Sequence, residues 1–398
     1  MSKREYDLII VGGGLGGSAL AKAMAEKGAR VLVTERELQF KDRIRGEWMA
    51  PWGVAEAQRI GIYDLLLDRC ACEQPYFKTF APESVRDFRA TTAQSLPPLT
   101  FYHPSMQEVI LGAAESAGAE VRRGVTVRDV KPGEPPVATI EANGVVRELT
   151  AHMVVCADGR SSAGRGWLGL SPKRAKPRYL GAGIMFENMP IAEEISLFVI
   201  NPSLGRIAIL FPQGHGRVRG YLVYPPEQIS RLQGEADFAR FVDECVSSGM
   251  PRECYADAQA QGPLASFDMT ENWVEHPYRA GVALIGDAAG ASDPTWGQGL
   301  SLTTRDVRVL AENLIASEDW NAGGHAYAEA HDKYFATSVK VGDWLFQLFL
   351  AQGAEADAVR ARAMPLIANE PERVPDHNAS GPDLPCDETV RRRFFGEE

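Results

Sequence analysis

The chain has 398 residues, of which 45% are hydrophobic, so it can bury a large core, which we expect to be divided between two interleaved domains. Its formal net charge of −11 argues against nucleic acid or an anionic membrane surface as a partner, because both require basic patches. The six cysteines are scattered, and Cys70 and Cys72 lack the two-residue spacer of redox or zinc pairs. Reduced thiols in a cytoplasmic protein are therefore expected.

The first part of the chain has the pattern of a β-α-β unit. An apolar run predicts a buried strand over residues 6–11, and periodicity predicts a helix over 15–27, stopped by Gly28. A second strand is expected over 30–34. The apolar run is interrupted by glycines and is followed by an amphipathic helix, which favours this unit over a secretory signal.

The turn between the first strand and the helix carries the spacing Gly-x-Gly-x-x-Gly, formed by Gly12, Gly14 and Gly17. Glycines at this spacing allow a tight turn, a close approach of backbone N–H groups to a pyrophosphate, and close helix–strand packing. Phosphate then lies at the helix N-terminus, where Leu15 and the neighbouring Gly16 begin the helix. Glu35 ends the second strand, where an acid can accept hydrogen bonds from ribose hydroxyls. The unit therefore predicts a dinucleotide site, with Arg36 beside it.

In the middle of the chain, the predicted pattern changes from alternating strands and helices to consecutive strands. A helix is expected over 102–118, then a strand over 120–127, a hairpin around Asn143-Gly144 and a buried strand over 152–157. Strands over 179–186, 195–200, 206–211 and 218–224 are separated by turn residues and predict an antiparallel meander.

The chain then returns to the first domain. A strand near 282–285 precedes a long helix over 300–317, and the proline- and charge-rich region beyond residue 353 is expected to be surface-bound or mobile. We predict an α/β fold: a Rossmann-like domain over 1–75, 100–177 and 266–352, an inserted antiparallel-sheet substrate domain over 76–99 and 178–265, and a short helical or irregular C-terminal tail over 353–398.

Two further glycine-bearing motifs follow the first in a fixed order. One is Asp158-Gly159 with Ser162 and Arg165, and the other is Gly286-Asp287 followed by Pro294-x-x-Gly297-Gln298-Gly299. With the first motif, they resemble the group A flavoprotein monooxygenases, the para-hydroxybenzoate hydroxylase-like family, over residues 5–320. The resemblance implies FAD as cofactor and NADPH or NADH as a transient electron donor.

The resemblance also implies a set of site residues. The Asp287 carboxylate would accept hydrogen bonds from the ribityl hydroxyls, Pro294 would form a wall beside the reactive flavin carbon, and the next helix would direct its N-terminus at the ring. Arg43 and Arg45 would serve the flavin or the donor, or are solvated charges. The implied cofactor contacts are Gly12, Gly14, Leu15, Gly16, Gly17, Glu35, Arg36, Arg43, Arg45, Gln107, Asp158, Gly159, Gly286, Asp287, Pro294, Gly297, Gln298, Gly299 and Leu300.

The chain departs from the family at two positions. Gly290 stands where many relatives carry histidine, and Ser301 stands where many carry asparagine, which would leave a smaller polar group at the ring edge. Trp48 and Trp52 are four residues apart on an expected helix and serve either packing or substrate contact. On the strand over 218–224, Arg219 and Tyr221 share a face that either is exposed or lines a substrate pocket.

The function implied is an NAD(P)H- and O2-dependent hydroxylation of a small aromatic substrate through a flavin C4a-hydroperoxide, by a monomer or homodimer. Alternatives are a flavin-dependent halogenase, for which Lys78 is a stray candidate, an isoprenoid-type flavin reductase, and a non-enzymatic flavin sensor. The seven histidines lack metal-site spacing, so no metal is expected. The apolar stretch 344–350 is too short to span a bilayer, so no membrane partner is expected.

Overall fold

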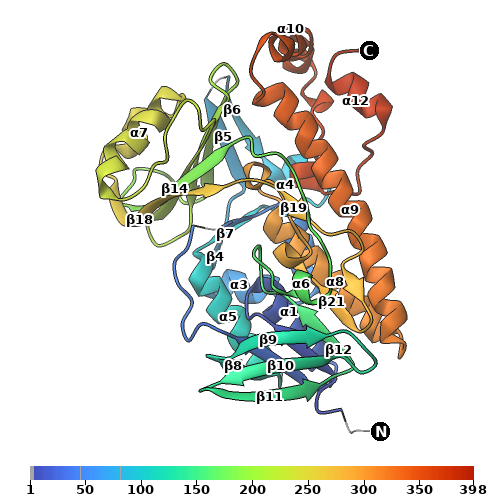
Figure 1. Cartoon of the computed structure of the whole chain (residues 1–398). Coiled ribbons are helices and arrows are strands. Elements are labelled where there is room, and N and C mark those ends of the chain that lie inside the picture. Colours follow the sequence, from blue (N-terminus) through green and yellow to red (C-terminus); the bar gives the residue numbers. More distant parts are fainter. Residues whose placement is uncertain (1–3, 45, 81) are drawn as a thin grey trace.

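A six-stranded sheet forms the centre of the lower part of the molecule in the computed structural model, which describes residues 4–44, 46–80 and 82–398 (Figure 1). Five strands are parallel and the edge strand β20 is antiparallel. The order is β20 (Tyr278–Arg279), β21 (Val282–Leu284), β12 (Met153–Cys156), β1 (Leu8–Val11), β2 (Val31–Glu35) and β8 (Glu120–Arg123). The central strands are apolar along their whole length because both faces of the sheet are covered.

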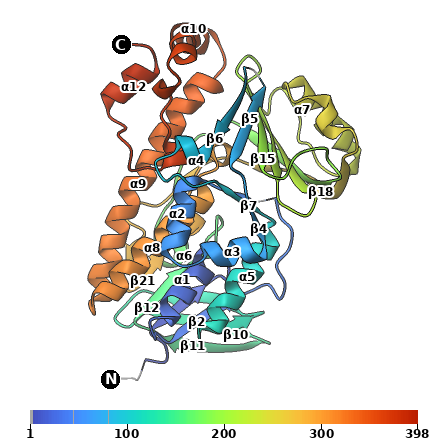
Figure 2. The ribbon, with the colours of Figure 1, turned by 180° about the vertical axis from the view of Figure 1, so that it is seen from behind.

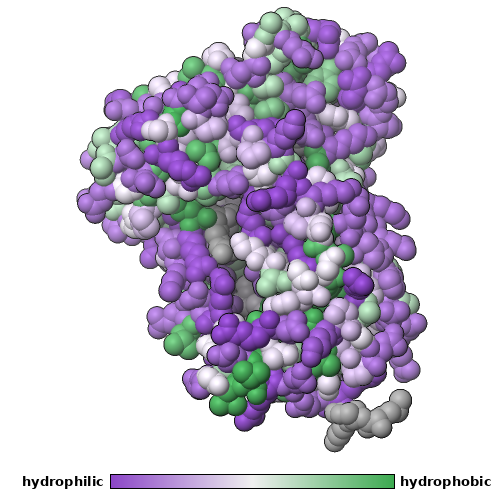
Figure 3. All heavy atoms as spheres, viewed as in Figure 1, coloured by the Kyte–Doolittle hydropathy of each residue, from purple (hydrophilic) through white to green (hydrophobic). Residues whose placement is uncertain are grey.

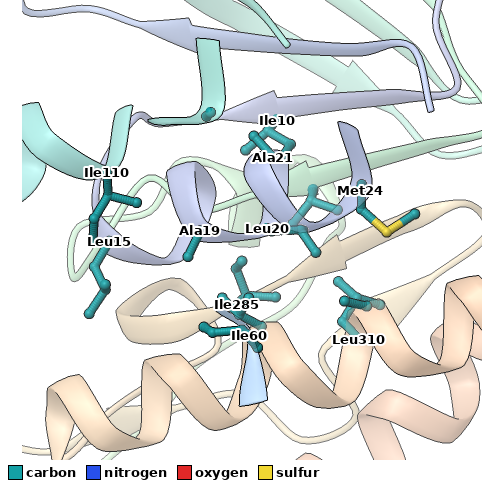
Figure 4. Close-up of a cluster of buried hydrophobic side chains, with 14 of the residues drawn as sticks. Ile10, Leu15, Ala19, Leu20, Ala21, Met24, Ile60, Ile110, Ile285 and Leu310 are labelled. Atoms are coloured by element: carbon teal, nitrogen blue, oxygen red, sulfur yellow. The ribbon is translucent and has the colours of Figure 1, made fainter. Parts of the chain in front are cut away.

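Helices cover one face of this sheet and a small antiparallel sheet covers the other. The helices are α1 (Leu15–Ala25), α2 (Pro51–Arg59), α3 (Tyr63–Arg69), α5 (His103–Ser116) and α8 (Gly299–Ala316). Figure 4 shows side chains of α1 gathered with Ile10 of β1 and Leu310 of α8 in this core. The second face packs against β9 (Thr126–Lys131), β10 (Val137–Ala142) and β11 (Val145–Thr150). The predicted hairpin at Asn143-Gly144 joins β10 to β11, with both residues at positive φ.

A seven-stranded sheet forms the upper part. Its order is β18 (Gln259–Asp268), β14 (Leu180–Glu187), β17 (Arg217–Tyr224), β16 (Arg206–Pro212), β15 (Ile195–Asn201), β5 (Tyr76–Phe80) and β6 (Glu83–Asp87). Strands β5 and β6 therefore join a sheet whose other strands come much later in the sequence, and β5 pairs with β15 in parallel. The expected antiparallel sheet is present, while the exact domain boundaries stay a prediction.

The strand order corrects the predicted meander. Strands β15, β16 and β17 follow one another as neighbours, but β14 pairs with β17 rather than with β15. Turn residues mark where strands end and not which strands pair, so sequence spacing did not reveal this crossover. Helix α7 (Phe238–Ser247) packs on one face of the sheet, where Phe241 contacts Val218, Leu222 and Tyr224 in one buried cluster.

The C-terminal region is helical and packed. Helix α9 (Trp320–Phe349) runs along much of the height of the molecule, and α10 (Ala354–Asn369) and α12 (Glu388–Phe394) lie at its upper end (Figures 1 and 2). Helix α11 (His377–Ser380) packs against α2 instead. Ala363, Phe394 and Phe395 are buried in one cluster with side chains of the upper sheet and α9, so of the two alternatives the tail is bound to the rest of the molecule rather than mobile. No helix in the described ranges is both long and apolar enough to cross a membrane.

Two three-stranded sheets connect the two parts. One contains β3 (Trp48–Met49), β7 (Leu99–Phe101) and β4 (Ala71–Glu73), and the other contains β13 (Lys173–Arg174), β19 (Asn272–Trp273) and β22 (Gly290–Ala291). Trp48 and Trp52 do not share a helix as predicted, because α2 begins at Pro51 and the residue before a proline is disfavoured in helical conformation. Ala50 is extended, with ψ of 156°.

Candidate functional site

A pocket of about 530 Å³ lies between the parallel sheet and the upper sheet. Figure 3 shows the molecule hollowed on one face between these two parts, with hydrophilic residues around the opening. The segments after β1, β12 and β21 line the pocket, as expected for the carboxyl ends of parallel strands. Twelve of the predicted cofactor residues line it: Gly14, Leu15, Gly16, Arg43, Gln107, Gly159, Gly286, Asp287, Pro294, Gly297, Gly299 and Leu300.

The first glycine motif forms the expected turn, and its glycines have two different roles, one in backbone packing and one in lining the pocket. Gly12 has φ of +107°, and a Cβ there would lie 2.5 Å from the Ala157 carbonyl oxygen. A Cβ at Gly17 would lie 2.0 Å from the Gly12 carbonyl oxygen. These two glycines therefore allow the turn and the close helix–strand packing, while Gly14 and Gly16 present backbone to the pocket.

The Glu35 side chain holds this turn through a hydrogen bond to its backbone. Its Oε2 accepts a hydrogen bond from the Gly13 N–H at 2.8 Å, and its Oε1 accepts one from the Glu37 N–H at 2.8 Å. The predicted ribose contact stays a prediction, because neither Glu35 nor Arg36 is among the residues that line the pocket. The Arg36 side chain is 69% exposed.

Asp158 is placed differently from the prediction. Its carboxylate accepts hydrogen bonds from the Ser162 hydroxyl at 2.6 Å and the Ala163 N–H at 2.7 Å, at the start of α6 (Gly164–Trp167). It caps this short helix and does not line the pocket, whereas Gly159, Arg160 and Ser161 do. Arg165 does not pair with an acid but donates to the carbonyl oxygens of Arg160, Asp287 and Ala288, so it ties the second motif to the third.

The third motif surrounds the start of α8. Asp287 and Pro294 line the pocket, and Gly297, at φ of +67°, turns the chain so that α8 begins at Gly299 beside them. Gln298 points away: its Oε1 accepts from Trp52 Nε1 at 3.1 Å, and its Nε2 donates to the carbonyl oxygens of Trp296 and Asn378. Its predicted contact with the cofactor is therefore limited to the backbone.

The arginine-bearing segment also reaches the pocket. Arg43 lines it and donates to Glu37 Oε1 at 2.7 Å, and Gln107 of α5 lines the opposite side of the glycine turn. The predicted role of Arg45 lies outside the described residues. Lys78, the stray candidate for a halogenase lysine, forms an ion pair with Glu83 at 2.8 Å and does not line the pocket.

The two departures from the family pattern both serve packing. A Cβ at Gly290 would lie 2.5 Å from Cε2 of Phe335, so the phenyl ring fills the space that a larger residue would need. Ser301 is fully buried, and its hydroxyl accepts from the Ala50 N–H at 3.1 Å in the contact between α2 and α8. The expectation that Ser301 lies at the ring edge is wrong, since it is not among the lining residues.

The upper sheet supplies an apolar wall to the pocket. Its lining side chains come from β16, β17 and the end of β18: Ile209, Phe211, Tyr221, Val223, Phe267 and Met269. Trp48 stacks on Phe211 with ring centroids 6.1 Å apart and planes at 14°. The Tyr221 face of β17 is therefore not exposed. Asp42 and Glu47 contact Arg219, Glu47 also contacts Tyr221, and Tyr221 packs on a cluster that includes side chains of α9.

A buried charged cluster, which sequence reasoning missed, stands at this wall. Glu47 accepts hydrogen bonds from Arg219 Nε at 2.6 Å, Gln213 Nε2 at 2.6 Å and the Tyr221 hydroxyl at 3.3 Å. Arg219 also contacts Asp42 at 2.9 Å. Glu47 and Arg219 are each 1% exposed, so removing either would leave an uncompensated buried charge. The side-chain pattern gave no signal for this pair, because its members are far apart in the sequence.

Burial sets the protonation of this cluster. It raises the pKa of the Glu47 carboxyl, against the opposing effects of the Arg219 charge and the hydrogen bonds. Burial, with the nearby Glu47 charge, raises the pKa of the Tyr221 hydroxyl well above its usual range. The Tyr221 hydroxyl therefore stays protonated at neutral pH and donates a hydrogen bond to the Glu47 carboxylate. Arg219 pairs with two carboxylates, so its guanidinium holds Asp42 and Glu47 against the upper sheet.

The lining residues fit a flavin dinucleotide. Eight of them are glycines, and at Gly16 and Gly297 a Cβ would lie 3.0 Å and 2.9 Å from side chains of Thr303 and Trp48. Their backbone therefore faces the pocket without side chains, while two helix N-termini, of α1 and α8, favour negative charge there. Among the described residues no three potential ligands are grouped to hold a metal ion. The fold and the pocket lining therefore suit a flavin dinucleotide as the bound cofactor.

Comparisons with known proteins agree. The sequence model of the FAD binding domain family matches residues 5–347. Squalene epoxidase 2, mitochondrial, of Arabidopsis thaliana is 24% identical over 383 residues, covering 88% of this chain and 62% of that protein. Digeranylgeranylglycerophospholipid reductase 2 of Methanopyrus kandleri is 26% identical over 332 residues, covering 79% and 77%. The crystal structure of p-nitrophenol 4-monooxygenase PnpA from Pseudomonas putida DLL-E4 has a TM-score of 0.75 at 21% identity, covering 100% and 98%.

The chain belongs to the FAD binding domain family, whose model matches most of its length. The family match supports FAD as the cofactor, and NAD(P)H is the electron donor typical of the family. It spans 62% of the length of the squalene epoxidase that it matches.

Proposed function

We propose that this protein is an FAD-dependent monooxygenase that uses NAD(P)H and O2 to hydroxylate a small aromatic substrate. One observation carries the proposal: a single pocket has the flavin-type glycine motifs on one side and an apolar, aromatic wall on the other. Bound FAD would supply electron transfer and oxygen activation. The substrate would occupy the space between the cofactor and the upper sheet.

We further propose that the twelve predicted residues lining the pocket bind FAD. The Asp287 carboxylate is an acceptor suited to the ribityl hydroxyls, and the N-terminus of α8 at Gly299 favours negative charge on the reduced ring. Pro294 presents a rigid surface without an N–H. The apolar wall, with Phe211 and Phe267, excludes water from the reacting groups, and Tyr221 offers the polar contact that would orient a substrate.

The test is a screen of phenols, anilines and indoles with the FAD-loaded enzyme. Stimulated NADPH oxidation, matching O2 uptake and a product carrying one atom from ¹⁸O2 are expected for at least one compound. Tyr221→Phe should then raise KM or uncouple oxidation from product formation. Tyr224→Phe is the matched control, because Tyr224 lies on the opposite face of β17 against α7. Equal behaviour of both variants would contradict the assignment of this wall to the substrate.

A reductase acting on isoprenoid double bonds is the second candidate, since one relative is named a digeranylgeranylglycerophospholipid reductase. The apolar wall is compatible with such a chain. An isoprenoid alkene reduced anaerobically by the holoenzyme, with no O2 uptake in any assay, would favour this activity over hydroxylation. O2 incorporation into product would exclude it.

A further inference from the structure

A run of positive charge borders the pocket in a chain whose net charge is −11. Lys173, Arg174, Lys176 and Arg178 fall within six residues, and all four are exposed. Arg160 of the second motif lies at the same border and lines the pocket. We call Arg160, Arg174, Lys176 and Arg178 the basic rim.

Backbone pairing fixes the basic rim beside the pocket. Strand β13 pairs with β19, and β19 pairs with β22, which leads into the third motif. The Ala175 N–H donates to the Glu271 carbonyl oxygen at 3.0 Å. Lys176 and Arg178 line a small cavity together with Met269, and Met269 also lines the main pocket. The cationic side chains therefore stand at the edge of the flavin site.

The rim is only partly neutralised. Arg178 pairs with Asp343 at 2.8 Å and lies over the Phe346 ring at 4.4 Å. Glu271 and Asp293 line the small cavity with Lys176 and Arg178, but within the described ranges no ion pair involves Arg174 or Lys176. Arg160 donates to the Thr270 carbonyl oxygen, which is uncharged. Although burial opposes it, hydrogen bonds from Thr270 and the charges of Arg160 and Arg174 lower the pKa of Asp268, a lining residue. The field of these arginines thus reaches the pocket wall.

We infer that the basic rim binds the phosphates of the nicotinamide donor and favours NADPH over NADH. The inference rests on the proposed function, which requires a donor. The chain has one dinucleotide-binding β-α-β unit in its described part, and FAD takes that unit, so the donor must enter from the mouth of the pocket. The pyrophosphate and the 2′-phosphate of the donor would need cationic side chains at the mouth, and arginine guanidinium groups form bidentate hydrogen bonds to phosphate oxygens. A locally positive mouth also concentrates an anionic donor against the overall charge.

Direct binding tests the inference without turnover. In the FAD-loaded protein, Arg174→Gln with Lys176→Gln should weaken binding of 2′,5′-ADP roughly ten-fold, because charge-assisted contacts to its phosphates are lost, and should weaken binding of 5′-AMP, which lacks the 2′-phosphate, clearly less. The matched control is Lys27→Gln with Arg147→Gln, which removes the same charge at the end of α1 and on the edge strand β11. It should change neither affinity. Arg174→Lys with Lys176→Arg should restore binding.

Flavin reduction then separates the two proposals. With wild-type enzyme, reduction by neither donor would contradict the proposed function, and with it the inference. If NADPH reduces the flavin and the rim variant raises its half-saturation concentration roughly ten-fold with an unchanged limiting rate, the inference is supported. Unchanged 2′,5′-ADP affinity in the rim variant, or an equal loss in the Lys27 and Arg147 control, would overturn the inference and leave the proposed function standing.

Discussion

At the scale of single residues, the Phe335 ring occupies the space that a side chain at position 290 would need. The phenyl ring lies where the Cβ of any other residue at position 290 would be, 2.5 Å from Cε2. The same ring stacks on His331 of α9, with centroids 5.4 Å apart, so it has little room to move. The position that carries histidine in many relatives is therefore closed here by a side chain from another element.

Gly290→Ala should lower the free energy of unfolding by about 1–3 kcal/mol, because overpacking forces the ring or the backbone to shift. Urea unfolding measures it. Adding Phe335→Leu should recover part of the loss by opening space. Gly112→Ala is the control, since a Cβ on this helical position meets nothing within 4 Å, and it should be neutral or slightly stabilising. A Gly290→Ala protein as stable as wild type would show that the ring yields freely.

A second residue-scale prediction concerns Glu271. Burial, reinforced by the negative charge of Asp293, raises its pKa from 4.5 to about 7. The native state thus holds this proton more tightly than the unfolded chain, so the stabilisation is full below pH 4.5 and is lost as pH rises through 7. Relative to the Glu271→Gln variant, the free energy of unfolding of the wild type should fall by at most on the order of 3 kcal/mol between pH 4.5 and 8.

Urea unfolding of both proteins across this pH range gives the difference, and Glu115→Gln on the surface of α5 is the control. A constant difference between wild type and Glu271→Gln would contradict the raised pKa.

At the scale of elements, the short helix α11 fixes the loop that starts α8. Asn378 of α11 accepts a hydrogen bond from Gln298, and Gln298 accepts one from the Trp52 indole of α2. Next to this contact, Arg86 of β6 pairs with Asp376 and Arg305 of α8 pairs with Asp383. The C-terminal segment thus connects the upper sheet to the cofactor side of the pocket.

Gln298→Ala should cost about 1–3 kcal/mol of stability, because buried donors and acceptors on Trp52 and Asn378 lose their partner. It should also weaken FAD binding, since the Gly297–Gly299 backbone loses its anchor. Calorimetric titration with FAD and urea unfolding measure the two effects. Gln58→Ala on the exposed side of α2 should change neither. Retained FAD affinity in a destabilised Gln298→Ala protein would separate the anchor from the cofactor.

The sequence predicted where helices and strands lie along the chain better than it predicted which strands pair and which side chains meet. Glycine spacing and apolar runs located β1, α1, β2, α5 and the start of α8 because those signals are local. Pairing of β14 with β17, and the addition of residues 76–87 to the same sheet, depend on contacts distant in sequence. The site followed the same rule: backbone-lining glycines were predicted, but Asp158 and Gln298 carry motif positions whose side chains serve caps and loops. The Glu47–Arg219 pair, from two remote segments, had no local signal.

At the scale of the whole molecule, FAD would touch both halves of the structure. Ligand bound to the native state alone stabilises by mass action, by about 2.7 kcal/mol at a hundred times the dissociation constant. FAD should therefore raise the apparent unfolding midpoint of the apoprotein in a concentration-dependent way, in far-UV and in tryptophan signals together. Riboflavin at the same concentration should raise it less, because it lacks the part that the Gly12–Gly17 turn is built for. Equal shifts would contradict that assignment.

The insertion of residues 76–87 into the upper sheet has a consequence for biosynthesis. The β5–β6 hairpin leaves the ribosome well before β15, its neighbour, which begins at Ile195. At about 5–20 residues per second, the intervening chain takes on the order of ten seconds to appear. During that interval the hairpin has an open edge, and the parallel sheet still lacks β20 and β21. Newborn chains should consequently depend on chaperones that shield such edges, and premature termination before Leu284 should yield insoluble fragments rather than a folded half.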